Sequence, residues 1–222
     1  MTGGRLDAAA ADGQVPGPLV SLSDKKLPRD FYTRAGVLAV ARDLLGQLLV
    51  VPAEDGTRVS GIIVETEAYR GPEDRASHAH GGRRTERTET MYLVGGTAYV
   101  YFVYGMHHQF NVVTNVAESP HAVLIRALEP VDGTDLMRRR RHGQPVANLT
   151  SGPGKLCTAL GIDRGLDRAD LLGDRAWIEQ GEHRIQPSAI ARGPRIGIEY
   201  AGDWAKVPWR FWIKTNPFVS RS

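Results

Sequence analysis

The sequence predicts an α+β fold, with an antiparallel sheet and helices that lie outside it. The chain has 222 residues, of which 41% are hydrophobic and 24% charged, as is usual for one globular domain with a sizeable core. Strand-like runs follow one another with only short turn signals between them, which favours antiparallel pairing. Helical patterns are short, and no internal repeat is visible.

The beginning of the chain divides into a tail and the first helix. Residues 1–22 are rich in Ala, Gly and Asp without an apolar period, so we expect a disordered N-terminal tail, with the folded domain over 23–222. Asp30 or Thr33 is placed to cap a helix running to about Leu45, because apolar residues recur there at helical spacing.

A β-hairpin should follow this helix. Residues 47–51 and 59–69 have strand character, and Asp55-Gly56 between them is a turn signal. The next stretch, 71–96, is long and polar. Loops of this length usually have a functional role.

Three further strand-like runs predict an antiparallel meander over 97–104, 109–116 and 122–128. Short helices are expected over about 132–141 and 155–160. The later strand candidates are 177–178, 195–198 and 211–214.

Charge and cysteine content narrow the class of protein. The net charge is +3, and only five of the 28 basic residues are lysine. Arginine suits planar contacts to phosphate, so a polyanionic partner is indicated. Cys157 is the single cysteine, which excludes an internal disulfide and a Cys-based zinc cluster and fits a reducing cytosol. No run approaches the ~20 apolar residues of a membrane helix, and no secretory signal is visible.

Two glutamates of the second strand are candidates for chemistry. Alternation places Ile63, Glu65, Glu67 and Tyr69 on one face of this strand. Two such carboxylates repel each other unless a cation or water separates them. One interpretation is that they belong to a solvated strand face. The other is that one carboxylate activates water, beside an aromatic ring that holds a flat substrate.

Arg126 lies inside an apolar strand, where alternation gives it the same face as Leu124 and Leu128. A guanidinium there is costly unless an anion meets it, and Glu67 or Glu65 would serve. The alternative is a side chain that snorkels from the strand end.

The segment 97–106 is unusually aromatic. Tyr99 and Tyr101 share one face, and Tyr101 is a candidate pocket wall. Tyr104 and Met106 lie at the expected hairpin tip, where they are candidate wedges between DNA bases. The alternative interpretation is core packing with one surface tyrosine.

Polar clusters offer further hypotheses. Asp74, His78 and His80 suggest a metal site, although no second motif completes it, and His78 alternatively belongs to a hydrogen-bonded pocket. Basic clusters occur at Arg83, Arg84 and Arg87 and at 138–141, where solvated faces are the default. Gly154 and Lys155 open a helix, and phosphate binds well at such a start.

Together these segments closely resemble the alkyladenine DNA glycosylase family, also called 3-methyladenine DNA glycosylases. The resemblance runs from about Phe31 to Val219, and the order and spacing of its segments argue against chance. The segments that carry it are 65–69, 71–74, His78, 81–83, 99–101, 104–106, Asn111, 126–130, 151–157, 202–204 and 217–219.

The resemblance implies a base-excision-repair enzyme, and the short, Arg-rich chain suggests a bacterial source. The family flips an alkylated or deaminated purine out of duplex DNA and hydrolyses its N-glycosidic bond, leaving an abasic site, without a metal, another cofactor or a lysine Schiff base. It implies a single mixed domain around a curved, open-barrel-like antiparallel sheet with flanking helices and a protruding β-hairpin. We expect a cytoplasmic, nucleoid-associated monomer that binds damaged double-stranded DNA through the minor groove.

By match to the family motif, Glu67 is the general base that activates water. Arg126 and the main-chain carbonyl of Ile196 help to hold that water. Asn111 guards the pocket against the exocyclic amine of guanine. The flipped base is expected among Tyr69, His78 and Tyr101.

The resemblance also assigns residues that engage the DNA. Tyr104 is the finger that fills the gap left by the flipped base, and Met106 lies beside it. The expected backbone contacts are Arg83, Arg87, Gly154 and Lys155.

Two other functions remain open from the sequence. A non-catalytic binder of distorted DNA would use Tyr104 as a wedge and form no abasic product. A metal-dependent hydrolase would use Asp74, His78 and His80 and would lose activity with a chelator.

Overall fold

The computed structural model describes residues 25–182 and 184–220, so the expected tail over 1–22 lies outside the described residues. The helices are α1 (Arg29–Thr33), α2 (Val37–Asp43), α3 (Thr134–Arg140) and α4 (Pro153–Leu160). The strands are β1 (Leu48–Val50), β2 (Ser60–Tyr69), β3 (Ala98–Val103), β4 (His107–Thr114), β5 (His121–Pro130), β6 (Trp177–Glu179), β7 (Ile190–Gly193) and β8 (Arg210–Ile213). The 3₁₀ turns are η2 (Gly71–Glu73), η3 (His80–Gly82), η4 (Glu89–Tyr92), η5 (Val146–Asn148), η6 (Arg164–Leu166), η7 (Pro187–Ala189) and η8 (Glu199–Lys206).

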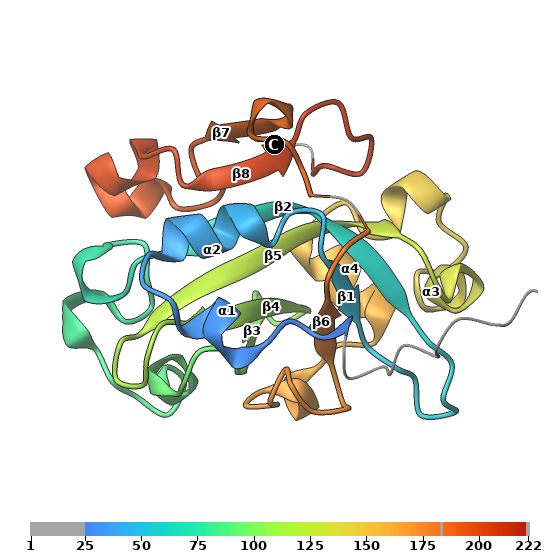
Figure 1. The fold of residues 1–222 in the computed structure, drawn as a ribbon, viewed down its shortest axis with the longest axis horizontal. Helices are drawn as coiled ribbons and strands as arrows, with labels where there is room; N and C mark the ends of the chain where they lie inside the picture. The colour runs from blue at the N-terminus through green and yellow to red at the C-terminus, as the bar shows by residue number, and fades with distance from the viewer. Residues whose placement is uncertain (1–24, 183, 221–222) are drawn as a thin grey trace, which may run out of the picture.

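In the part of the chain that the structure describes, all eight strands join one sheet, which curls into a half-barrel, and their pairings are antiparallel (Figure 1). Its main path is β3-β4-β5-β2-β1-β6. β2 pairs with β5 along one edge, while β1 and β8 share its other edge. The α+β prediction, the hairpin of β1 and β2 and the meander of β3, β4 and β5 are therefore confirmed.

Two compensating bulges change the predicted faces of β2 and β5. The register passes from Ile63 opposite Leu128 to Glu65 opposite Ala127, and then to Thr66 opposite Ile125. Val64 and Arg126 are thus the extra residues on their strands, and each shifts the alternation by one.

The bulges put Ile63 and Leu128 into the main core, together with Ala68 and Ile125. Ile63 and Ala68 are five residues apart and would face opposite sides of a regular strand. The prediction that Ile63 shares a face with Glu65 was therefore wrong, as was the face shared by Arg126 and Leu128.

The first predicted helix is two helices. α1 ends at Thr33, and α2 begins after Gly36, whose φ of 97° is in the left-handed region that favours glycine. Neither Asp30 nor Thr33 caps α2. The single helix to about Leu45 was wrong, because the left-handed backbone at Gly36 interrupts it and the apolar residues that predicted it, from Leu38 on, all lie after this break.

The later strands are predicted with one error. β6 and β8 lie close to the expected runs, but 195–198 is irregular and β7 precedes it. β7 pairs with β8, which in turn pairs with β2. The segment 195–198 is thereby placed beside the end of β2, where it lines a cavity instead of joining the sheet.

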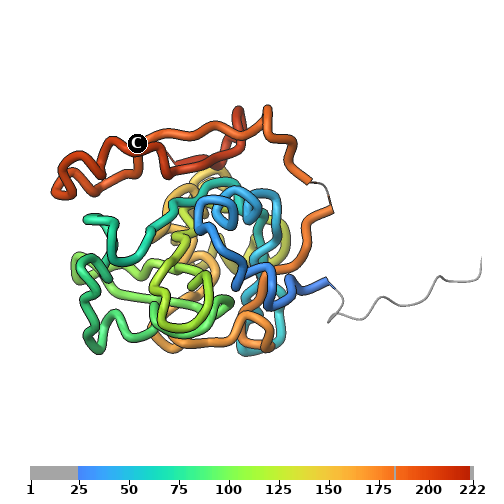
Figure 2. Tube along the Cα trace, turned by 60° about the vertical axis from the view of Figure 1, so that its left-hand side comes forward, coloured from blue at the N-terminus to red at the C-terminus, as the bar shows by residue number. Residues whose placement is uncertain are grey.

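The main core lies on one face of the sheet and includes the apolar sides of α2 and α4. The opposite face carries two smaller apolar clusters, one around Tyr99 and Tyr101 and one around Ile198. The C-terminal part, with β7 and β8, forms a layer beside α2 (Figures 1 and 2). Among the described residues, no helix has the length and apolarity needed to cross a membrane.

Candidate active site

A cavity of about 150 Å³ opens on the sheet face away from the main core. Its walls come from β2, β3, β4 and β5, the 71–96 loop and the 195–200 segment. The predicted residues that line it are Tyr69, His78, Tyr101, Tyr104, Asn111, Arg126 and Ile196. The sheet therefore brings together side chains from across most of the chain.

Glu67 lies behind this cavity and is fully buried. Its Oε1 accepts a hydrogen bond from the Ile196 N–H at 2.8 Å, and its Oε2 accepts one from the Tyr69 hydroxyl at 2.8 Å. Arg126 Nη1 lies 3.3 Å from Oε1. All three neighbours line the cavity, so they connect the carboxylate to it.

Arg126 separates the two strand glutamates, as the sequence predicted for a buried cation. Its Nε donates to Glu65 Oε1 at 3.1 Å. Glu65 also accepts hydrogen bonds from the Ser220 N–H at 2.8 Å and from Arg210 Nη1 at 3.3 Å. The bulge at Arg126 turns its side chain to the glutamates instead of the core.

The protonation of Glu67 reflects two opposing influences. Burial raises the pKa of the Glu67 carboxyl above its ordinary value. Arg126, the Ile196 N–H and the Tyr69 hydroxyl favour the charged form and oppose part of that rise in pKa. The result is a buried carboxylate with a raised proton affinity, as suits a general base.

Aromatic rings form one wall of the cavity. The rings of His78 and Tyr101 meet edge to face with centroids 4.6 Å apart, and Tyr99 lies 5.1 Å from Tyr101. His78 Nδ1 is hydrogen-bonded to the Tyr99 hydroxyl at 2.9 Å. Burial and the charges of Arg87 and Arg83 lower the pKa of His78 to about 4, so its imidazole is neutral at pH 7.

Polar groups of β4 complete this wall. Asn111 is buried, and its amide donates to the main-chain carbonyl of Tyr99 at 3.1 Å, which fixes its orientation. Gln109 faces Tyr101 across the ladder and accepts a hydrogen bond from its hydroxyl at 2.7 Å.

The tip of the β3–β4 hairpin presents apolar side chains to solvent. Tyr104 and Met106 are 83% and 67% exposed. Tyr104 has φ 54° and Gly105 has φ 67°, and the Met106 N–H donates to the Val103 carbonyl at 3.1 Å. Two left-handed residues in this position make a type I′ turn. An aromatic residue held there under backbone strain and in solvent indicates a functional role.

The predicted basic cluster divides into different environments. Arg84 is tied to Glu89 and Glu118 and lies over the Tyr92 ring. Arg83 and Arg87 are exposed, and the Arg87 guanidinium lies 5.1 Å from the Tyr101 ring centroid, at the rim of the cavity.

The start of α4 lies against the turn end of the hairpin, where His107 pairs with Val103. A Cβ at Gly154 would come within 3.0 Å of the His107 ring, so the helix approaches β4 closely there. Lys155 donates to Asn148 and to Ser151, which places its ammonium at the same helix start.

The proposed metal ligands have other partners. Asp74 forms a buried ion pair with Arg195, and His80 Nδ1 is hydrogen-bonded to the Pro72 carbonyl at 3.0 Å. His78 is bonded to Tyr99. In the described part of the chain, no group of three or more His, Cys, Asp or Glu side chains is arranged to hold a metal ion.

Several cavity residues were not predicted from the sequence. Tyr99 could have been found, because it shares a strand face with Tyr101. Gln109 could not, because its importance depends on the register that sets it opposite Tyr101. Tyr200 is 69% exposed at the cavity and shows no sequence signal.

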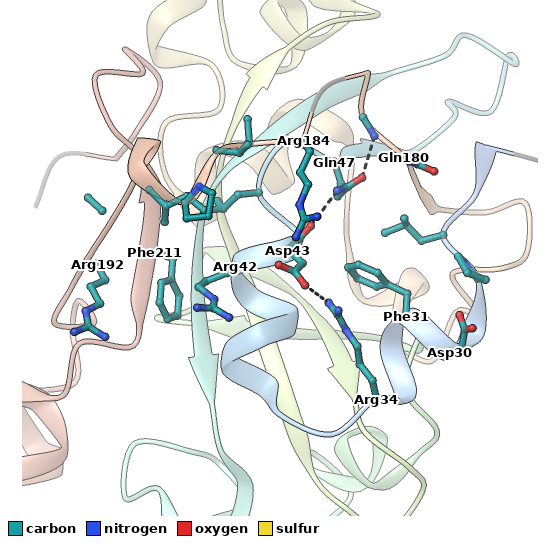
Figure 3. A pocket seen from close by; sticks show the side chains of 18 residues that line it. Asp30, Phe31, Arg34, Arg42, Asp43, Gln47, Gln180, Arg184, Arg192 and Phe211 are labelled. Atoms are coloured by element: carbon teal, nitrogen blue, oxygen red, sulfur yellow. Dashed lines mark hydrogen bonds and ion pairs between the residues drawn. The ribbon is translucent and has the colours of Figure 1, made fainter.

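A larger cavity of about 840 Å³ lies elsewhere, between α2 and the C-terminal layer (Figure 3). Some of its polar side chains already have partners: Arg34 pairs with Asp43 at 2.8 Å, and Gln47 donates to the main-chain carbonyl of Asp43 at 3.0 Å. It contains none of the residues that the sequence assigned to chemistry. Its size therefore does not make it the candidate active site.

Comparisons with known proteins cover most of the chain. A family model described as methylpurine-DNA glycosylase matches residues 30–217. A relative from Bacillus cytotoxicus is 49% identical over 208 residues, which span 88% of this chain and 100% of that protein. A Bacillus cereus relative (strain G9842) is 50% identical over 87% of this chain and 98% of its own length. One from Desulfitobacterium hafniense is 46% identical over 88% of this chain and 98% of its own length. All three are provisionally named 3-methyladenine DNA glycosylase.

Proposed function

Because the chain belongs to the methylpurine-DNA glycosylase family, we propose that it removes alkylated or deaminated purines from double-stranded DNA with a water activated by Glu67. As a DNA glycosylase it is a hydrolase of N-glycosidic bonds, which favours an enzyme over the non-catalytic damage binder. The product of the proposed reaction is an abasic site.

The hydrogen bonding of Glu67 carries this proposal. Oε1 already accepts a hydrogen bond from the Ile196 N–H and is ion-paired with Arg126. Among the described residues, Oε2 accepts a hydrogen bond only from the Tyr69 hydroxyl. A carboxylate oxygen has room for two hydrogen bonds, so Oε2 can accept a proton from water on the cavity side. Arg126 and the main-chain carbonyl of Ile196 hold that water, as the family resemblance assigns.

Water activation is sufficient for a cationic leaving base. An alkylated purine carries positive charge and already departs readily, so proton removal from water is the main requirement. The Glu67 carboxylate also stabilises the positive charge that develops on the sugar, and burial strengthens this interaction.

The cavity suits a flat purine. Tyr69, Tyr101 and His78 offer aromatic surface, and electron-rich rings attract a cationic base. Because the pKa of His78 is lowered to about 4, its neutral imidazole does not repel such a base. Asn111 excludes the exocyclic amine of guanine. At about 150 Å³ the cavity is smaller than typical drug-sized pockets of roughly 300–1,000 Å³.

The enzyme engages DNA as a monomer from the minor-groove side. Tyr104 enters the base stack with Met106 beside it and offsets part of the few kcal/mol that base flipping requires. Phosphate contacts, which carry no sequence information, come from Arg83, Arg87, Gly154 and Lys155.

The direct test is Glu67→Gln, assayed on duplexes with one alkylated or one deaminated purine. We expect single-turnover excision to fall by about 10²–10⁴-fold with little change in affinity for the damaged duplex. Glu179→Gln is the matched control, because Glu179 is also buried and ion-paired but lies outside the cavity. Excision retained by Glu67→Gln would reject the assigned base, and loss of activity with a chelator would favour metal-dependent hydrolysis.

A further inference from the structure

We propose that Arg195, held by Asp74, is a positioning residue. Three groups approach the Glu67 carboxylate as hydrogen-bond donors, and Arg195 orients the two that do not belong to Arg126. These donors are the Tyr69 hydroxyl and the Ile196 N–H. The inference rests on the proposed function, because it concerns the geometry of the same general base.

The Arg195 guanidinium is held through both of its terminal nitrogens, Nη1 and Nη2. Its side chain and that of Asp74 are both 0% exposed, and Nη1 and Nη2 reach the two oxygens of Asp74, with Nη2 to Oδ1 at 2.9 Å. Nη1 also donates to the Ala68 carbonyl at 2.9 Å, and Nη2 lies 3.3 Å from the Trp204 carbonyl. A bidentate guanidinium with these further acceptors has a single well-defined orientation.

This guanidinium controls both donors. It stacks on the Tyr69 ring at 4.8 Å, with the Trp209 ring at 5.2 Å, so it sets the plane in which the Tyr69 hydroxyl reaches Glu67. Ile196 is the next residue along the chain, and its N–H donates to Glu67 Oε1 at 2.8 Å. One buried group therefore determines how two of the three donors approach the carboxylate.

Asp74 anchors the arrangement to the loop that follows β2. Its Oδ1 accepts from the Ala76 N–H at 2.9 Å and its Oδ2 from the Arg70 N–H at 3.2 Å. Fold stability alone does not account for such a pair, because buried ion pairs are often no more stabilising than apolar residues of similar volume. The need to orient the Tyr69 hydroxyl and the Ile196 N–H gives a reason for the buried Arg195–Asp74 pair.

The position of these donors has a consequence for pH dependence. Donors to a carboxylate favour its ionised form, so losing their alignment raises the pH at which Glu67 loses its proton. The titratable or charged groups around Glu67 are Arg126 from β5, Tyr69 and Glu65 from β2, Tyr101 from β3, Arg210 from β8 and Arg195 itself.

The test is Arg195→Lys, which keeps the charge but cannot form the bidentate, stacked arrangement. We expect single-turnover excision of a cationic methylated purine to fall by about 10²-fold, since small misplacements of catalytic groups have effects of this size. The acid limb of the rate profile should move to higher pH, while affinity for the damaged duplex stays within a few-fold. Asp74→Asn should act in the same direction and replaces this variant if Arg195→Lys does not fold.

Arg58→Lys is the control, because Arg58 Nη1 and Nη2 each donate to a different oxygen of Glu179 at 3.0 Å, away from the cavity. It should keep the wild-type rate and pH profile. A folded Arg195→Lys protein with a lower melting temperature but wild-type rate and acid limb would overturn the inference and leave the pair purely structural. Failure of the wild-type enzyme to excise the base would instead reject the proposed function.

Discussion

The Arg126 side chain shows how a single buried charge is stabilised in this protein. It lies between Glu65 and Glu67, both of which are fully buried, with Nε and Nη1 directed to different carboxylates. Removing one partner from such a group leaves uncompensated charge in a medium that solvates it poorly.

Arg126→Met should therefore lower the free energy of unfolding by about 3–5 kcal/mol, measured by urea denaturation. It should also abolish most excision in the fraction that remains folded. Arg84→Met is the comparison, because Arg84 also lies between two glutamates, Glu89 and Glu118, but at the surface. We expect a far smaller loss of stability there, since exposed pairs are weak. Equal losses in the two variants would contradict this account of Arg126.

The raised pKa of Glu67 predicts a pH dependence of the reaction. A general base acts only when it is ionised, so a pKa raised by burial moves the loss of activity to higher pH than for an ordinary glutamate. Single-turnover rates on a cationic methylated purine, which needs no leaving-group protonation, should fall as the pH drops through this raised value.

His78 provides the control for that profile. Its pKa of about 4 is below the ordinary histidine value, so it should not contribute a step near pH 6.5. The acid limb should persist in His78→Gln. If the limb disappeared in this variant, the titration would belong to His78 and not to Glu67.

At the scale of elements, the β3–β4 hairpin is shaped by its turn. The type I′ turn at Tyr104-Gly105 matches the twist of paired strands and projects Tyr104 into solvent. Its left-handed backbone is unfavourable for a bulky residue, so another feature must compensate for a tyrosine at this position.

Tyr104→Ser should weaken binding to a damaged duplex and reduce base flipping, because the gap in the stack is no longer filled. Fluorescence of 2-aminopurine next to the lesion and titration of affinity would measure both. Tyr104→Phe should retain both properties, and Val131→Ser, which removes an exposed apolar side chain outside the cavity lining, should change neither. Unchanged affinity and flipping in Tyr104→Ser would show that the finger assignment is wrong.

At the scale of the whole molecule, the net charge is only +3, but the exposed basic residues lie in separate places on the surface. Arg83 and Arg87 lie exposed near the cavity, whereas other exposed arginines, such as Arg138, lie on α3. Electrostatic contacts to phosphate release counterions, so affinity should fall steeply with added salt.

The salt dependence gives a prediction for individual residues. Replacing Arg83 or Arg87 by Ala should reduce the slope of log K against log salt by about one, if each residue meets one phosphate. Arg138→Ala is the control and should leave the slope unchanged. A flat response of the wild-type protein would argue against a phosphate-tracking surface.

The sequence by itself determined the antiparallel meander, the hairpin turns and the chemical character of the site, because these depend on local alternation, turn residues and the order of short motifs. It also predicted that Arg126 needs Glu65 or Glu67, since a buried charge requires a partner wherever it lies.

Only the tertiary structure decided which faces the side chains take and what holds Glu67. The bulges at Val64 and Arg126 arise from pairing between distant strands, so no periodicity in one strand reveals them. Likewise, 195–198 has the pattern of a strand, yet packing against the end of β2 makes it the support of the carboxylate. Local sequence sets which residues are available, and long-range packing sets which of them meet.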